Sequence, residues 1–215
     1  MSKSSGVGVE PTELALRYGA DVVRFYLMSQ VPWGKDGEFT FERFETAYTA
    51  FLANGLGNLV SRAVGMALKY FDGVPEGPVD AYLHELCEEV RAESSAAYDA
   101  LRITEATESA WRLVREGNEQ VQSRAPWVMA KDPARRDELA GFLYGLLESI
   151  RLAAALLSPV MPGKCAAIQD AIGCARDRDR TGAELLAWGG LVANTPLRKP
   201  APLFPQLEQL LAAPE

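Results

Sequence analysis

Two polar side chains in one short segment could read the edge of a nucleic-acid base. In LGNLVSR, residues 56–62, Asn58 and Arg62 are four residues apart, so a helix places them on one face. The amide of asparagine offers a donor and an acceptor, and the guanidinium of arginine offers a fork of donors, which suits a base edge. The same spacing also fits an ordinary solvated helix face with a packed glycine pair, and the segment by itself favours that interpretation.

The second candidate is an aromatic side chain in APW, residues 125–127. Pro126 suits the first turn of a new helix, which places Trp127 at a junction between two helices. There the indole either anchors the core or stands exposed as a platform for an unstacked base, a contact worth about 1–3 kcal/mol. Because most tryptophans are largely buried, this segment by itself favours the core.

The chain opens with MSKSSG, in which one lysine lies among small hydroxyl residues. A lysine on a mobile loop can reach a triphosphate and stabilise charge as pyrophosphate departs, so Lys3 is the candidate for catalysis. His84 is the only histidine, so no histidine metal cluster can form, and we expect it on a helix, partly exposed. The sequence contains no P-loop and no GxGxxG segment.

Charge and cysteine content narrow the class of protein. The net charge is -7 over 215 residues, so a nucleic-acid partner must be read by a few local side chains rather than by a basic face. No window of about 18 residues is apolar enough to span a membrane, and the start is no secretory signal. The cysteines have no CxxC spacing, which argues against a zinc site or a disulfide scaffold and fits a reducing cytoplasm: Cys87, Cys165 and Cys174.

Apolar periodicity predicts the helices that must position these side chains. A first helix begins at residues 10–13 with Thr12 as its cap, and further helices follow at about 41–71, 79–122, 135–157 and 165–172. The polar stretch 102–108 could break one of them. Helix 135–157 is apolar nearly all round, so we expect it at the centre of the core. Nothing reads as a strong strand, so we predict an all-α fold, a bundle of about five helices.

Two features of this bundle need a packing explanation. Gly55 and Gly57 lie inside the predicted helix 41–71, where each costs about 1 kcal/mol relative to alanine. We therefore expect a compensating feature, such as close helix packing. The proline-rich stretch 188–208 shows little periodicity and is predicted to wrap back over the bundle as an extended tail.

Six segments together resemble the C-terminal half of the methionyl-tRNA synthetases, a family of class I aminoacyl-tRNA synthetases. The first, MSKSS, looks like the family's KMSKS loop without its initial lysine. Each segment alone is unspecific, but their co-occurrence in this order and spacing is specific and covers nearly the whole chain. They are MSKSS at 1–5, YGADVVRFYL at 18–27, GKDGEFT at 34–40, LGNLVSR at 56–62, APW at 125–127 and LFP at 203–205.

The resemblance implies a role for each candidate residue. The family reads the CAU anticodon of tRNA with an asparagine, an arginine and a tryptophan at the positions of Asn58, Arg62 and Trp127, which favours the exposed, base-reading interpretation. Lys3 matches the dominant lysine of the ATP-contacting loop, whose other matching members are Met1, Ser2 and Ser4. The implied regions are a KMSKS loop and connector at 1–40, a helical anticodon-binding domain at 41–187 and an extended C-terminal tail at 188–215.

The resemblance also implies what the complete enzyme does. The family attaches methionine to tRNA with ATP and Mg2+. Its Rossmann-like catalytic domain, with a His-Ile-Gly-His signature and a zinc-bearing insertion, precedes the KMSKS loop, and these 215 residues contain none of it. We therefore expect a synthetase cut at the KMSKS methionine that is inactive alone, holds no metal, is monomeric and cytoplasmic, and has tRNA and a separately encoded catalytic half as candidate partners.

Three other interpretations stay open from the sequence. One is a related synthetase of another amino-acid specificity, against which the APW and LFP segments favour methionine. The chain could be a non-catalytic tRNA-binding module that acts in trans, or a structural relative that binds nothing. A buried Trp127 and a masked Arg62 would favour the structural relative. If the connector normally packs on a catalytic domain, an apolar patch near Val22, Phe25 and Tyr26 is expected to lie exposed.

Overall fold

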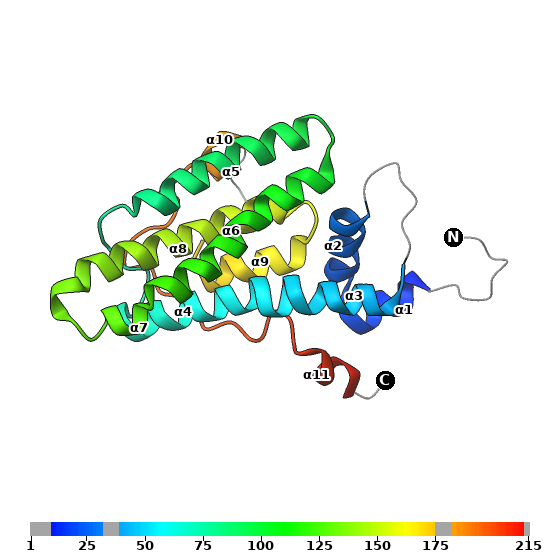
Figure 1. Ribbon diagram of the computed structural model, residues 1–215, viewed down its shortest axis with the longest axis horizontal. Coiled ribbons are helices and arrows are strands. Elements are labelled where there is room, and N and C mark those ends of the chain that lie inside the picture. Colours follow the sequence, from blue (N-terminus) through cyan, green and yellow to red (C-terminus); the bar gives the residue numbers. More distant parts are fainter. Residues whose placement is uncertain (1–9, 32–38, 175–181, 213–215) are drawn as a thin grey trace.

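The computed structural model describes residues 10–31, 39–174 and 182–212, and every regular element in these ranges is a helix. Figure 1 shows the long helices α4, α5, α6 and α8 running along the length of the molecule, with α2 lying across one end. The elements are α1 (Pro11–Tyr18), α2 (Ala20–Gln30), α3 (Phe41–Ala47), the π-helix η2 (Tyr48–Gly57), α4 (Asn58–Phe71), α5 (Ala81–Asp99), α6 (Ile103–Arg124), α7 (Pro126–Met129), the 3-10 helix η3 (Pro133–Arg135), α8 (Arg136–Leu157), α9 (Pro162–Ala171), α10 (Gly182–Leu186) and α11 (Leu207–Ala212).

The predicted all-α bundle is confirmed, with two breaks in the expected helices. The expected helix 79–122 is two helices, α5 and α6, because the chain turns at residues 100–102, where Leu101 adopts a left-handed conformation with φ 58°. The first helix is likewise interrupted at Gly19, whose φ of 94° suits glycine. Thr12 is not the cap: Glu10 is, and its Oε1 accepts from the Thr12 hydroxyl at 3.0 Å.

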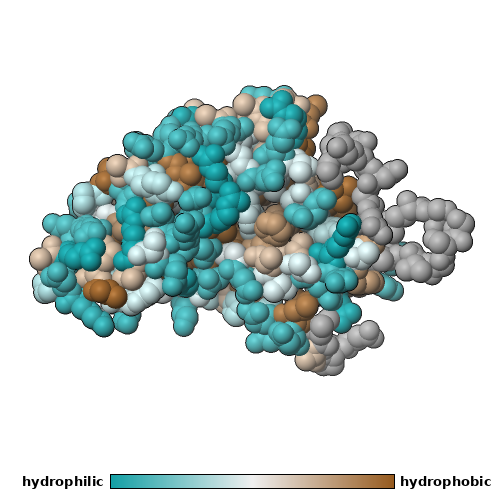
Figure 2. Space-filling view, in the orientation of Figure 1, coloured by the Kyte–Doolittle hydropathy of each residue, from teal (hydrophilic) through white to brown (hydrophobic). Residues whose placement is uncertain are grey.

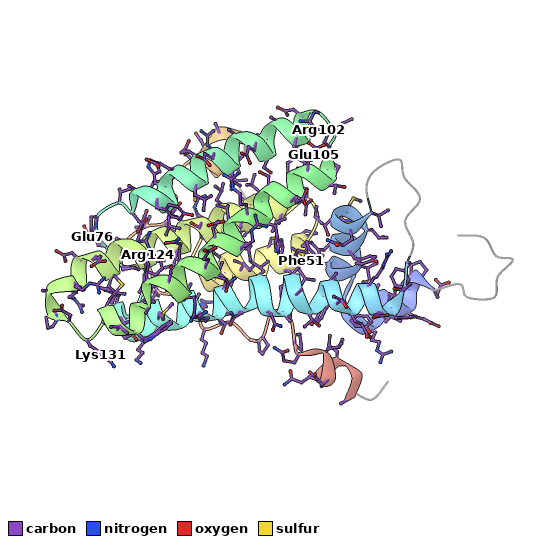
Figure 3. All side chains as sticks on the ribbon, in the orientation of Figure 1. Phe51, Glu76, Arg102, Glu105, Arg124 and Lys131 are labelled. Atoms are coloured by element: carbon purple, nitrogen blue, oxygen red, sulfur yellow. The ribbon has the colours of Figure 1, made fainter. Side chains whose placement is uncertain are left out.

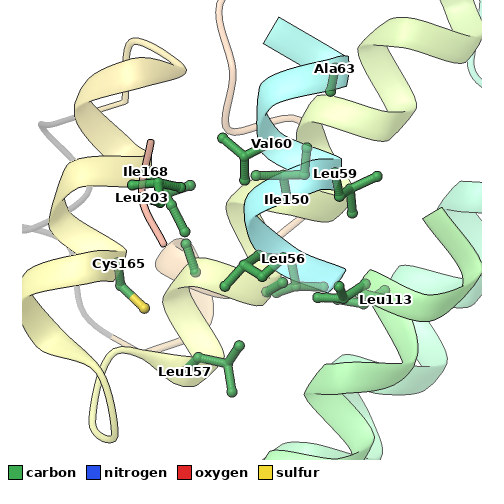
Figure 4. Close-up of a cluster of buried hydrophobic side chains, with 14 of the residues drawn as sticks. Leu56, Leu59, Val60, Ala63, Leu113, Ile150, Leu157, Cys165, Ile168 and Leu203 are labelled. Atoms are coloured by element: carbon green, nitrogen blue, oxygen red, sulfur yellow. The ribbon is translucent and has the colours of Figure 1, made fainter. Parts of the chain in front are cut away.

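Helix α8 forms the centre of the core, as its sequence predicts. Every residue from Leu139 to Leu157 except Tyr144 is buried. The expectation that no window is apolar enough to span a membrane is wrong by length and composition, because residues Pro133–Leu157 pass that test. However, 94% of that window is buried inside the protein, which is the environment of a core helix. Figure 4 shows α8 residues Ile150 and Leu157 packed among side chains of α4, α6, α9 and the tail.

The connector packs on the bundle, contrary to the exposed patch expected from the sequence. Val22, Phe25 and Tyr26 are all buried, and the ring of Phe25 lies 4.9 Å from that of Trp111 on α6. The Arg24 guanidinium donates to the carbonyls at residues 159 and 160, at 2.7 and 2.9 Å. The bundle itself therefore covers the apolar side of α2.

The π-helix η2 sits between α3 and α4 within one continuous helical run. A Cβ on Gly55 would lie 3.5 Å from the indole of Trp111, and one on Gly57 would lie 3.3 Å from the ring of Phe204. The Gly55 distance is an ordinary van der Waals contact, whereas the Gly57 distance is tight, so Gly57 lets the tail approach closely and the close helix packing expected from the sequence is not what these glycines provide. The side chains of Trp111 on α6 and Phe204 in the tail therefore lie against the helical run just before α4.

The tail is held by a buried ion pair that we call the tail clamp, formed by Glu148 and Arg151 of α8. Their side chains are 0% and 1% exposed and lie 2.9 Å apart. Arg151 donates to the carbonyls of Leu185 (2.7 Å) and Ala187 (2.5 Å). Glu148 accepts from the backbone N–H groups at 189 (3.2 Å) and 191 (2.5 Å), so the pair is saturated by the segment that it holds.

Candidate nucleic-acid interface

The first turns of α4 present the two polar candidates on one face of the helix. Asn58 is exposed and Arg62 is half-buried, while the intervening Leu59 and Val60 are buried in the core. The apolar side of α4 therefore fixes the rotation of the helix, and the opposite side carries Asn58 and Arg62 outward. As their spacing of four residues predicts, both side chains lie on one face of a helix.

Trp127 reaches the surface through a sharp turn between α6 and α7. Ala125 adopts a left-handed conformation with φ 46°, which redirects the chain after Arg124, and Pro126 begins α7. Pro126 and Met129 are buried and anchor this short helix. Trp127 between them is 39% exposed. The core interpretation of Trp127 is wrong, because the buried members of α7 are its neighbours.

The structure brings Arg62 and Trp127 together from distant parts of the sequence. The guanidinium carbon of Arg62 lies 5.7 Å from the centroid of the Trp127 ring, within cation–π range. Asn58 lies one helical turn from Arg62. The result is a surface with an aromatic face, a fork of donors and an amide side by side, which is the set of groups that recognises an unstacked base. The buried Trp127 that would favour a relative without a ligand is not observed.

Asn118 of α6 also belongs to this surface, although nothing in the sequence singles it out. The Asn58 side-chain amide donates to Asn118 Oδ1 at 3.3 Å. Asn118 in turn donates to the carbonyls of Gly55 (3.2 Å) and Val114 (2.9 Å). No spacing within α6 signals a contact with α4, because that contact arises only from the packing of the two helices.

A second ion pair holds the end of α6 that leads to Trp127. Arg124 pairs with Asp80, the residue that caps α5 through a bond from the Leu83 N–H, and its guanidinium lies 5.0 Å from the ring centroid of Phe142. Figure 3 labels Arg124 and Lys131 toward the end of the bundle where α7 lies, and Arg102 at the other end of α6.

The remaining candidates are not part of this surface. Met1, Ser2, Lys3 and Ser4 lie outside the described residues. His84 is half-buried on α5, as expected, with its ring 5.0 Å from that of Trp188.

The described residues contain no cluster of metal-ligating side chains. No group of three or more His, Cys, Asp or Glu side chains within them could hold a metal ion. Three cysteines are buried and form no disulfide among the described residues: Cys87, Cys165 and Cys174. Burial raises the pKa of the Cys87 and Cys165 thiols to about 12, so neither is a ready thiolate nucleophile.

Comparison with known proteins covers both parts of the chain. Residues 1–64 match the class I tRNA synthetases of the methionine type, and residues 72–210 match the family described as the anticodon binding domain of methionyl tRNA ligase. Among relatives, the methionine–tRNA ligases of Synechocystis sp. and Bacillus subtilis are each 38% identical over 97% of this chain. The chain spans 42% and 32% of the length of these two relatives.

Solved structures give the same result. The chain is similar to Mycobacterium tuberculosis methionyl-tRNA synthetase in complex with methionyl-adenylate, with a TM-score of 0.86 and 34% identity over 95% of this chain and 41% of that one. For the apo form of the M. tuberculosis synthetase the TM-score is 0.81, with 31% identity over 92% of this chain and 41% of that one. Asn58 and Arg62 fall in the first matched region and Trp127 in the second. The chain therefore belongs to the methionyl-tRNA ligase family and carries that family's anticodon-binding domain.

Proposed function

We propose that this chain supplies anticodon recognition to a methionine–tRNA ligase and binds tRNA that carries the anticodon CAU. The observation that carries the proposal is the exposed Trp127 ring with the Arg62 guanidinium carbon 5.7 Å from its centroid. Asn58, one turn away on the same face, supplies the amide. Together these groups offer one stacking surface and directional hydrogen bonds for bases splayed out of a loop.

The charge balance supports recognition by bases rather than by phosphates. With a net charge of -7, the chain cannot bind RNA tightly through a broad basic face, and each phosphate contact would add to the salt dependence of binding. Figure 2 shows that the visible face is mostly hydrophilic, with apolar residues scattered rather than gathered in one patch. Specificity then depends on the few groups around Trp127.

The proposal for the complete enzyme also includes ATP contact and methionine transfer, the other functions of the family. There Lys3, within the ATP-contacting loop at residues 1–4, would stabilise the phosphates of ATP while Mg2+ assists, and tRNA would receive methionine in the cytoplasm. The three regions 1–40, 41–187 and 188–215 stay a prediction of the sequence. We expect this 215-residue chain alone to be monomeric and to catalyse no methionine-dependent ATP–pyrophosphate exchange; any exchange by the pure chain would refute that part.

The test compares variants for binding to a stem-loop with the CAU anticodon, at one stated salt concentration. Trp127→Ala removes the stacking surface, so affinity should fall about 5- to 150-fold, the equivalent of 1–3 kcal/mol. Trp127→Phe keeps an aromatic face and should retain most of the affinity. Arg62→Ala should weaken CAU binding more than binding to a loop with a changed anticodon.

Arg102→Ala is the matched control for Arg62→Ala. Arg102 is an exposed arginine at the other end of α6. Within the described residues, its one ion pair is with the exposed Glu105. Its loss should leave affinity for both stem-loops unchanged. Binding that ignores the anticodon and is the same in all four variants would overturn the proposal.

A further inference from the structure

Asn118 is the middle member of a hydrogen-bonded chain that links α6, the π-helix η2 and the first residue of α4. Its side-chain nitrogen donates to the carbonyls of Gly55 and Val114, at 3.2 and 2.9 Å. Its side-chain oxygen accepts from the Asn58 amide nitrogen at 3.3 Å. Asn118 is half-buried, whereas Asn58 is exposed, so the chain runs from the interior outward.

The chemistry of the two backbone partners fixes the direction of this chain. A backbone carbonyl can only accept a hydrogen bond, so the donors of the Asn118 amide must face Gly55 and Val114. Its oxygen must then face Asn58. Because an amide oxygen also only accepts, Asn58 must turn its nitrogen toward Asn118. Neither amide can flip without placing two acceptors against each other.

The outcome is a defined polarity at the surface. With its nitrogen committed inward, Asn58 directs its oxygen away from Asn118, and in the part of the chain that the structure describes no hydrogen bond to that oxygen is found. Arg62, four residues on, offers only donors. The surface thus pairs one fixed acceptor with a fork of donors, a pattern that distinguishes base edges by where their donor group lies.

We propose that Asn118 is a positioning residue that sets the anticodon selectivity of this surface by fixing the orientation of the Asn58 amide. This inference rests on the proposed function, because it concerns how the same surface discriminates bases. Asn118 acts through Asn58 and does not touch the RNA. The π-helix contributes the Gly55 carbonyl, one of the two acceptors that determine the orientation.

The test is a double-mutant cycle on selectivity, defined as the ratio of the Kd for a changed anticodon to the Kd for CAU. Asn118→Leu releases Asn58 to rotate, so selectivity should fall about 3- to 10-fold, the equivalent of one hydrogen bond. In an Asn58→Ala background the same substitution should change selectivity less than 2-fold. Asn118→Ser, which can still bond its own helix at Val114, should behave like Asn118→Leu and guards against misfolding of the Leu variant.

Gln122→Leu, an exposed polar-to-apolar change one turn further along α6, is the matched control and should leave selectivity unchanged. A merely structural role for Asn118 would weaken both stem-loops equally and would do so with or without Asn58; that result overturns the inference. If Arg62→Ala and Trp127→Ala also leave binding unchanged, the proposed function fails instead. The two failures are therefore distinguishable.

Discussion

Replacement of Arg151 by methionine should unfold the tail and destabilise the whole chain. Arg151→Met keeps the length of the side chain but removes the guanidinium, which is 1% exposed and bonds Glu148 and the carbonyls of Leu185 and Ala187. Glu148, 0% exposed, then keeps only its two backbone donors, and the carbonyls of Leu185 and Ala187, just before the tail, lose this partner. The variant leaves a buried charge without a counter-charge.

The magnitude follows from this burial. Breaking a buried ion pair by removal of one partner costs about 3–5 kcal/mol, because the remaining charge stays desolvated. At about 2–4 °C per kcal/mol for a chain of this size, the midpoint of thermal unfolding should fall by roughly 6–20 °C. Glu148→Gln in the same chain removes the uncompensated charge and should recover part of the loss.

The assay is equilibrium urea unfolding, together with limited proteolysis of the tail. Arg91→Met is the matched control, because Arg91 pairs with Glu88 at the same spacing and in the same order but with side chains 37% and 39% exposed. That control should cost about 0–1 kcal/mol. Equal destabilisation by Arg91→Met and Arg151→Met, or an Arg151→Met tail as resistant to protease as the parent's, would show that the tail clamp is not what holds this segment.

Three further predictions concern backbone and thiols. Gly65→Ala should stabilise α4 by about 0.5–1 kcal/mol, since a Cβ added there meets nothing within 4 Å. Gly57→Ala should not stabilise it, because a Cβ added there lies 3.1 Å from a backbone oxygen. Urea unfolding compares the free energies of unfolding of the two variants. Ala125 has a left-handed backbone conformation, which costs a residue with a Cβ about 1–2 kcal/mol. Ala125→Gly removes this steric cost and should raise the midpoint of thermal unfolding. Cys87 and Cys165, whose pKa burial raises to about 12, should resist a thiol reagent at pH 8 until urea unfolds the chain, and fast labelling in the native state would refute this.

The all-α class and the central helix could be predicted because their signal is local. An apolar run such as 139–157 requires burial on every side, and only a core position provides it. The polar stretch 102–108 indicated a possible break, but the turn lies at residues 100–102 and helix α6 begins at Ile103, because a left-handed Leu101 leaves no mark in the sequence. The π-helix was likewise not predicted, because Gly55 and Gly57 were interpreted only as a sign of close helix packing.

The burial of the connector depends on contacts between distant segments. The apolar side of α2 predicts that something covers Phe25, but it does not name Trp111 of α6 as the cover. The carbonyls that Arg24 bonds lie after α8, more than a hundred residues further along the chain. Tertiary packing of this kind decides between an interface with another domain and an internal contact, and periodicity does not.

For the site, spacing predicted the shared face of Asn58 and Arg62, while the exposure of Trp127 required the resemblance. The indole is exposed because Ala125 turns the chain and Met129 takes the buried position. Asn118 was missed because a lone asparagine within a helix has no distinctive neighbours in sequence. Its role appears only when the carbonyl of Gly55 and the amide of Asn58 are placed beside it.

The most direct test of anticodon recognition is the affinity of the unaltered 215-residue chain for a CAU stem-loop and for the same loop with one anticodon base changed. Each mismatch should leave polar groups of the surface unpaired, so we expect CAU to bind at least about 10-fold more tightly, the equivalent of 1.4 kcal/mol. The preference should persist when the salt concentration is raised, although both affinities fall. Equal affinities for the two loops at every salt concentration would contradict the account.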